Sequence, residues 1–306
     1  MEQTPRTAPS ATGASGAPDP DRASRLRMLL ATADHLRERW HLRQDGPIRS
    51  GEAGIVLPVR GADGEAAALK VQPPGPEVDA AVLGLGQWDG EGIVRLLASD
   101  AERGGLLLER LDPERSLEGV TDDDEATRVV GALLARLHGI RPPDGLPLLG
   151  TVVQQMLHRA PEARRTLTAE DRRRFDRWVR RVGEVAAEAG DRFLHWDMHF
   201  GNVLHADREP WLAIDPEPLI GDAGFDLWPV LDSGWSSDPR RTDAARIVRR
   251  RFDILTDMLQ LDRDRATAWT AARLLQNTLW DIEDGEQAIA YSATVLDDAL
   301  QSRPAS

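Results

Sequence analysis

The sequence predicts an α+β protein of two lobes, a small antiparallel sheet followed by a larger, mainly helical part. Between residues 40 and 111, short runs rich in Val, Ile and Leu alternate with turns that contain glycine. Beyond Asp112 and Pro113, apolar residues recur instead at the three- and four-residue spacing of helices. The chain has 306 residues, of which 41% are hydrophobic, and this is enough for one large core or two modest ones.

The sheet lobe is expected to hold two hairpins, each with a helix before it. The turn of the first hairpin is Gly61-Ala62-Asp63-Gly64, a sequence typical of a tight reversal. Pro73, Pro74 and Pro76 end its second strand, because proline lacks the backbone N–H that a ladder needs. The expected elements are a helix over 23–39, strands over 54–60 and 65–71, a helix over 77–87, and strands over 93–99 and 104–110.

The helical lobe is expected to begin with a helix after Thr121 that ends at Gly139. The acid run at 122–125 suits a helix start, since the helix dipole favours negative charge there, and we assign it no further role. Further helices are expected over 169–188, 243–259 and 263–281, with a last one ending at Leu300.

We therefore divide the chain into three parts. Residues 1–22 are rich in Pro, Ala, Gly, Ser and Thr and lack an apolar signal core, so they are expected to form a flexible tail. The N-lobe covers 23–111, with a hinge at 106–111, and the C-lobe covers 112–306.

Composition limits the possible partners and compartments. A net charge of −13 argues against nucleic acid and anionic membranes and favours a cationic small molecule. There is no run of eighteen apolar residues, so we expect no membrane span. The chain has no cysteine, which excludes disulfides and thiolate metal sites and suits a cytoplasmic protein. We expect a monomer.

The most informative motif lies in residues 194–215, LHWDMHFGNVLHADREPWLAID. It places His195, Asp197 and Asn202 in the spacing H-x-D-x-x-x-x-N, and a short apolar run then leads to Asp215. Phosphoryl transfer from ATP needs this order: one carboxylate to take a hydroxyl proton, then an amide and a second carboxylate to hold Mg²⁺. Catalytic loops of protein kinases have the same spacing. We assign Asp197 as catalytic base and Asn202 and Asp215 as Mg²⁺ ligands, with His195 against the Asp215 segment.

Lys70 is the one lysine among 38 Lys and Arg residues, and it lies in the strand-like run Ala-Leu-Lys-Val. Where arginine is so strongly favoured, a lysine indicates a position that a planar guanidinium does not fit, such as a contact with ATP phosphates. Its expected acidic partner is Glu77 at the start of the next helix, with Asp79 left open. Gly51 lies in a turn whose amides could approach a phosphate, although an ordinary turn is an equal alternative.

ATP is expected between the lobes, with its adenine against the backbone of the hinge. Within 106–111 the candidate contacts are Glu109 and Leu111.

Several longer stretches resemble the aminoglycoside phosphotransferase family, which has a protein-kinase-like fold. The matching segments are HWDMHFGNVL, WLAIDPEPLIGDAGFDLWP, LLQNTLWDIEDG, SGEAGIVLPV, ALKVQ, LLLERLD and VRRRFDILT. Within the family, the chain is most similar to the streptomycin 6-phosphotransferases of antibiotic-producing actinomycetes. This resemblance implies transfer of the ATP γ-phosphate to the 6-hydroxyl of the streptidine ring, which inactivates the antibiotic. It also matches Glu77 to the partner of the ATP-binding lysine.

The substrate expectation adds a charge argument. Streptomycin carries two guanidinium groups, so its pocket should offer carboxylates and aromatic faces. Two stretches offer both kinds of side chain, although a solvated acidic helix end with a core tryptophan is an equal interpretation of the second. The candidates are Asp232 and Trp235 in the first stretch and Trp280, Asp281 and Asp284 in the second.

Two alternatives remain open. A kinase of the same fold acting on hydroxyurea, another aminoglycoside or a cationic peptide antibiotic would share all the chemistry up to Asp215. A catalytically dead nucleotide-binding protein is disfavoured, because Lys70, Asp197, Asn202 and Asp215 are all present.

Overall fold

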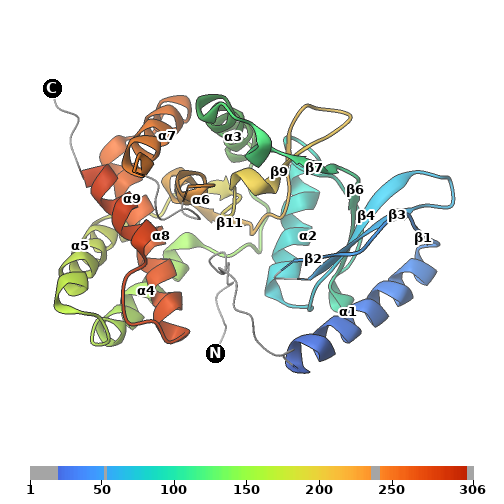
Figure 1. Ribbon diagram of the computed structural model, residues 1–306, viewed down its shortest axis with the longest axis horizontal. Coiled ribbons are helices and arrows are strands. Elements are labelled where there is room, and N and C mark those ends of the chain that lie inside the picture. The colour runs from blue at the N-terminus through green and yellow to red at the C-terminus, as the bar shows by residue number, and fades with distance from the viewer. Residues whose placement is uncertain (1–19, 52–53, 236–241, 302–306) are drawn as a thin grey trace.

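The computed structural model of the protein describes residues 20–51, 54–235 and 242–301. Figure 1 shows a twisted sheet at one end and a larger bundle of helices at the other. This is the expected two-lobed α+β arrangement. The predicted tail falls mostly on residues 1–19, which lie outside the described residues, and helix α1 (Pro20–Arg39) begins three residues earlier than predicted.

The sheet lobe is built on an antiparallel sheet of order β1-β3-β4-β6-β5, with β2 also paired to β3. Both predicted hairpins are confirmed, because β3 pairs with β4 and β5 pairs with β6, each antiparallel. The strands are β1 (Arg43–Gln44), β2 (Arg49–Ser50), β3 (Ile55–Arg60), β4 (Ala66–Val71), β5 (Leu96–Asp100) and β6 (Gly105–Glu109).

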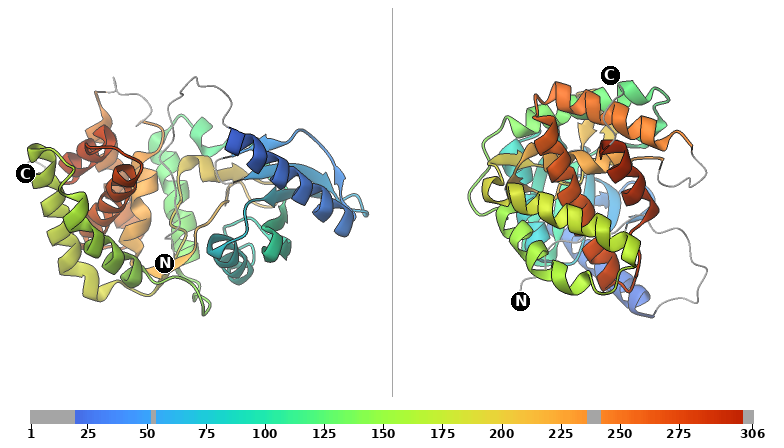
Figure 2. Two further views of the ribbon diagram at one scale, coloured as in Figure 1. Left: turned by 90° about the horizontal axis from the view of Figure 1, so that it is seen from below. Right: turned by 90° about the vertical axis from the view of Figure 1, so that its left-hand side faces the viewer.

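Side chains alternate between the two faces of β4, and this alternation places Lys70. Leu69 and Val71 are fully buried in a core that the sheet shares with Leu36 of α1. Lys70 therefore points to the opposite face, where α2 (Pro76–Trp88) lies. Figure 2 shows α1 along the outside of the sheet, at the far end from the helical lobe.

Helix α2 belongs to the same continuous core as the helical lobe. Its buried residues Val78, Leu85 and Trp88 are part of that core, and Trp88 stacks on Phe193 with ring centroids 3.8 Å apart. This stack joins the sheet lobe to the strand that leads into the catalytic loop, so the two lobes are packed together beside the site.

The helical lobe carries two small sheets between its helices. Strand β8 (Arg192–Leu194) pairs with β11 (Leu219–Gly221), while β9 (Val203–His205) pairs with both β7 (Asp112–Ser116) and β10 (Leu212–Ala213). The helices are α3 (Asp123–His138), α4 (Leu149–Ala163), α5 (Ala169–Val185), α6 (Leu227–Asp232), α7 (Ala244–Met258), α8 (Arg263–Glu283) and α9 (Tyr291–Gln301).

The predicted helices are present with small changes at their ends, but α4, α6 and the short strands were not predicted. Helix α4 has no capping side chain at its N-terminus, and Pro161 interrupts its helical sequence pattern. The usual signals that mark a helix in a sequence are therefore missing. Among the described helices, none has the combined length and apolarity needed to cross a bilayer.

Candidate functional site

The carboxylate of Asp226 holds the loop between β8 and β9, residues 195–202, in place. That carboxylate accepts hydrogen bonds from the backbone N–H groups of His195, at 3.0 Å, and Trp196, at 2.6 Å. It also lies 2.8 Å from Nε2 of buried His138. Trp196 has a φ of 66°, a left-handed conformation that is strained for a bulky residue and persists because this anchor holds it.

His195 joins the loop to the segment that carries Asp215. Its Nε2 lies 3.0 Å from the carbonyl oxygen of Ile214, and since a carbonyl only accepts, Nε2 carries the proton. Burial lowers the pKa of His195 to about 4, so the imidazole is neutral at pH 7. The expected contact of His195 with this segment is present.

Asp197 and Asn202 are linked across the loop. The side-chain amide of Asn202 donates to the backbone oxygen of Asp197 at 2.9 Å and to its carboxylate at 3.1 Å. Burial raises the pKa of Asp197, while nearby His199 and Arg273 act in the opposite direction. The Asp197 side chain remains 19% exposed, so its carboxylate is enclosed by protein yet open to a substrate.

Lys70 forms an ion pair with Asp215, with 2.6 Å between Nζ and Oδ1. Asp215 adopts a φ of 53°, and the N–H of the preceding Ile214 donates to the Asn202 carbonyl at 2.9 Å. Burial by itself raises the pKa of Asp215, but Lys70, together with His195 and His199, lowers it, and the pKa lies below its ordinary value. The structure thus brings Lys70, Asp197, Asn202 and Asp215 together, from segments up to 145 residues apart.

This donor set fits Mg²⁺. Because the side-chain nitrogen of Asn202 donates to Asp197, the side-chain oxygen Oδ1 of Asn202 is left to bind a cation. Asp215 keeps one carboxylate oxygen beyond the one that meets Lys70. The Asp215 side chain is 43% exposed. Within the described residues, no group of three or more His, Cys, Asp and Glu gathers as a metal cage. Mg²⁺ typically takes one or two protein oxygens and completes its shell with water and phosphates.

The remaining nucleotide candidates lie around this centre without all making the expected contacts. Glu77 is in the first turn of α2, but the ion pair of Lys70 is with Asp215. Glu77 is close enough to contribute to raising the pKa of Glu217. The Gly51 N–H donates to the Gly54 carbonyl at 2.9 Å, while residues 52 and 53 of this turn lie outside the described residues.

The hinge candidates lie at the end of β6. The Glu109 carboxylate accepts a hydrogen bond from Nε of Arg208 at 2.8 Å. The backbone N–H of Glu109 donates to the backbone carbonyl of Arg95 at 3.0 Å. Leu111 is buried just beyond the strand.

Two further ionisable residues, Glu217 and Arg273, are buried beside the catalytic loop. Burial raises the pKa of Glu217 to about 8, with a contribution from Asp197, and its Oε2 has no hydrogen-bond partner. Arg273 is fully buried beside the rings of Trp196, Phe225 and Trp228, and burial lowers its pKa to about 10. Arg273 was not predicted, although an arginine inside the apolar run Ala-Ala-Arg-Leu-Leu is a signal for it.

The five acceptor-side candidates are spread over two places. Asp232 ends α6 and is half-buried, whereas Trp235 is buried and its indole N–H donates to the Leu231 carbonyl. Trp280 is only 5% exposed near the end of α8. Asp281 and Asp284 follow it, and Asp281 lies about 12 Å along α8 from Arg273. In this conformation neither indole offers an open face.

At the end of α8, Glu283 is paired with Arg159, whereas Asp281 lies near the charges of Asp284 and Glu286. Burial, followed by the charges of Glu286 and Asp284, raises the pKa of Asp281 from its ordinary 3.8 to about 6. A bound cation would relieve this repulsion, because it favours the ionised carboxylate.

Comparison with known proteins identifies the family. The aminoglycoside/hydroxyurea antibiotic resistance kinases match residues 39–285. The chain belongs to this family. Relatives of the kinase include the streptomycin 6-kinase of Streptomyces griseus, 56% identical over 264 residues and 86% of each chain. The hydroxyurea phosphotransferase of Kitasatospora aureofaciens is 48% identical over 87% of this chain and 77% of its own.

Solved structures of low sequence identity share the fold of this kinase. The aminoglycoside phosphotransferase APH(3'')-Id of Streptomyces rimosus has a TM-score of 0.53 at 19% identity, covering 82% of this chain and 98% of that one. The macrolide 2'-phosphotransferase MphH of Brachybacterium faecium has a TM-score of 0.55 at 17% identity, covering 89% and 98%. The predicted family and kinase-like fold are thereby confirmed.

Proposed function

We propose that this kinase transfers the γ-phosphoryl group of ATP to streptomycin, at the 6-hydroxyl of the streptidine ring, and so confers resistance. The observation that carries the chemistry is the convergence of Lys70 on Asp215 and of Asn202 on Asp197. The substrate is supported by streptomycin 6-kinases at 56% and 52% identity, from Streptomyces griseus and Streptomyces glaucescens.

Each catalytic residue has one task in this mechanism. Asp197 orients the acceptor hydroxyl and takes its proton as the new oxygen–phosphorus bond forms and the bond to the β–γ bridging oxygen breaks. Lys70 sets the position of the nucleotide phosphates through the α- and β-phosphate oxygens. Asn202 and Asp215 would hold Mg²⁺, which neutralises the phosphate charge in the transition state. Asp226 and His195 keep the loop in register.

The nucleotide lies between the lobes in this proposal. Its adenine meets the backbone at Glu109 and Leu111, its phosphates approach the turn at Gly51, and Glu77 moves toward Lys70 when ATP separates that ammonium from Asp215. In this proposal the boundary between the lobes lies at 111 and 112, in the segment that joins β6 to β7. The proposed enzyme is a monomer, since the proposed mechanism needs no group from a second chain, and it acts in the cytoplasm, where ATP is available.

The acceptor site takes its charge from carboxylates. Asp281 and Asp284 at the end of α8 would pair with the guanidinium groups, and Asp232 would face the acceptor near the catalytic loop. Both indoles are buried, so a guanidinium could stack on Trp235 or Trp280 only after the side chains that cover them move. The proposed acceptor site therefore depends mainly on the carboxylates.

A second candidate substrate is hydroxyurea, which is favoured by the relative of that name at 48% identity. The test is to incubate the purified kinase with Mg²⁺ and ATP and each acceptor separately, and to measure product mass. We expect streptomycin to gain one phosphoryl group, on the 6-hydroxyl when the product is mapped by NMR. A gain by hydroxyurea with none by streptomycin would favour the second candidate.

A further inference from the structure

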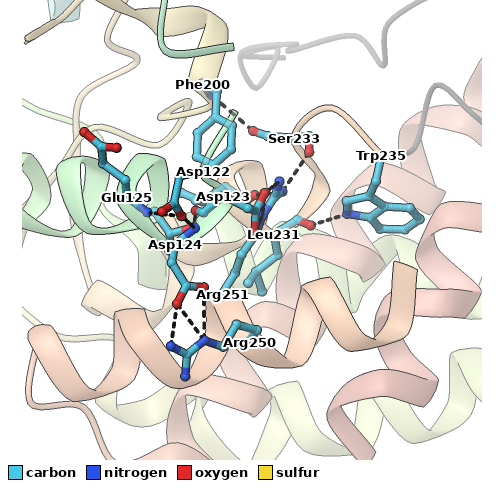
Figure 3. A network of polar contacts seen from close by, with 12 residues as sticks. Asp122, Asp123, Asp124, Glu125, Phe200, Leu231, Ser233, Trp235, Arg250 and Arg251 are labelled. Carbon is cyan, nitrogen blue, oxygen red and sulfur yellow. Dashed lines mark hydrogen bonds and ion pairs between the residues drawn. The ribbon is translucent and has the colours of Figure 1, made fainter. Parts of the chain in front are cut away.

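Arg251 on α7 has a buried guanidinium group that binds α3, α6 and the turn after α6. It is only 3% exposed, and its Nη1 donates to the carbonyl oxygens of Val230 and Ser233, both at 2.7 Å. Its Nε lies 3.1 Å from the carboxylate of Asp123, in the first turn of α3. Figure 3 shows these contacts converging on Arg251 from the turn after α6 and from the start of α3.

The fourth contact of Arg251 reaches the catalytic loop. Its guanidinium lies over the ring of Phe200, 4.6 Å from the centroid, and Phe200 is between Asp197 and Asn202 in the chain. The Phe200 N–H donates to the Ser233 hydroxyl at 3.1 Å, and that hydroxyl donates to the Pro229 carbonyl at 2.8 Å. The catalytic loop and the turn after α6 are thus fastened to each other, and Arg251 contacts both.

The neighbouring Arg250 is a natural control. It pairs with Asp124, one residue along from Asp123, with Nε 3.0 Å from a carboxylate oxygen. In contrast to Arg251, it is about half-exposed, and within the described residues its hydrogen bonds go to Asp124. Each of the two adjacent arginines therefore pairs with an aspartate in the first turn of α3, but Arg251 in addition contacts the end of α6 and the catalytic loop.

We propose that Arg251 is a positioning residue for phosphoryl transfer, which holds the end of α6, where Asp232 lies, at a fixed place against the loop carrying Asp197 and Asn202. The acceptor would then be presented to the base at a constant distance. This inference rests on the proposed function, because it takes Asp232 to be on the acceptor side.

Lysine cannot replace arginine in this role. A planar guanidinium reaches two carbonyls, one carboxylate and a ring face at once, whereas an ammonium offers its donors from a single atom and does not stack in the same way. A misplacement of about 1 Å between reacting groups lowers the rate by about 100-fold.

The test compares Arg251→Lys with Arg250→Lys, and adds Ser233→Ala as a second way to loosen the same junction. For each variant, kcat and the KM values for streptomycin and ATP are measured well below its melting temperature, with folding checked by circular dichroism. We expect Arg251→Lys to lower kcat by about tenfold or more and to raise the streptomycin KM, with the ATP KM within about twofold. Ser233→Ala should follow in the same direction, and Arg250→Lys should match the wild type.

A melting temperature that falls in Arg251→Lys while kcat and both KM values of the folded protein stay unchanged would overturn the inference. So would an equal rise in both KM values. If Arg251→Lys does not fold, wild-type constants in Ser233→Ala would overturn it equally. If the wild type leaves streptomycin unmodified, the proposed function fails, and the same variants compared with hydroxyurea or water as acceptor still decide the role of Arg251.

Discussion

Two acid-rich helix ends in this kinase have opposite electrostatic states. At the start of α3, Asp122 caps the backbone, Asp123 meets Arg251 and Asp124 meets Arg250, whose hydrogen bond lowers the pKa of Asp124. At the end of α8, burial and neighbouring acids instead raise the pKa of Asp281 to about 6. The first cluster also lies at the positive end of its helix dipole, whereas the second lies at the negative end.

The difference shows that composition alone does not define a cation site. Both segments are acidic runs in the sequence. In the fold, Asp123 and Asp124 meet Arg251 and Arg250, whereas at the end of α8 Arg159 meets Glu283 and the pKa of Asp281 stays raised, so positive charge beside Asp281 would be favourable. The α3 cluster thus contributes to stability, and the α8 cluster is the better candidate to bind the guanidinium groups of a substrate.

The largest expected effect is on stability at α3. Asp123→Asn leaves the buried Arg251 without its carboxylate partner, and we expect a loss of about 2 kcal/mol in the free energy of unfolding, measured by urea denaturation at pH 7. Unchanged stability would mean that the two backbone carbonyls satisfy Arg251 without Asp123.

Removing the α8 charges should affect the acceptor and leave the nucleotide unaffected. For Asp281→Asn combined with Asp284→Asn, we expect the streptomycin KM to rise about tenfold at low salt, with the ATP KM unchanged. Steady-state kinetics at two salt concentrations checks this. Equal changes in both constants would remove these carboxylates from the acceptor site.

The raised pKa of Asp281 predicts that its ionised carboxylate lowers the stability of the folded protein at neutral pH. The folded protein holds the proton up to about pH 6 while the unfolded chain releases it near 3.8, so stability falls as pH rises through this window. Asp281→Asn should therefore stabilise the protein at pH 7 by about 1 kcal/mol, allowing for solvent screening, and have no effect below pH 3.8. Thermal unfolding at both pH values tests the sign.

The smallest effect is expected at the exposed pair of the α3 cluster. Asp124→Asn should leave the melting temperature and both KM values within experimental error, because surface ion pairs contribute little. A clear loss of activity would mean that the pair of Asp124 and Arg250 also affects the catalytic loop.

The sequence was sufficient to predict which residues converge at the candidate site, because its signals are local, while their catalytic roles stay predictions. The spacing of Asp197, Asn202 and Asp215 and the isolation of Lys70 in a strand pattern identify all four residues that meet in the structure. The hairpins and most helices follow from periodicity and turn residues for the same reason.

What the sequence did not predict depends on pairing between distant segments. Arg251 and Asp123 are 128 residues apart, and no local pattern distinguishes Arg251 from Arg250. The expected pairing of Lys70 with Glu77 depends on how α2 sits on the sheet, and here Lys70 meets Asp215 instead. The burial of Trp235 likewise follows from packing among helices. For Trp280, the structure agrees with the core tryptophan that the sequence pattern left open as an equal alternative.

The most direct test of the central claim compares wild type with Asp197→Asn in streptomycin phosphorylation and in ATP binding. If Asp197 is the base, we expect kcat to fall by at least 100-fold while the Kd for Mg²⁺-ATP, measured by calorimetry, stays within about threefold. Phosphorylation at the wild-type rate by the folded variant would contradict the account.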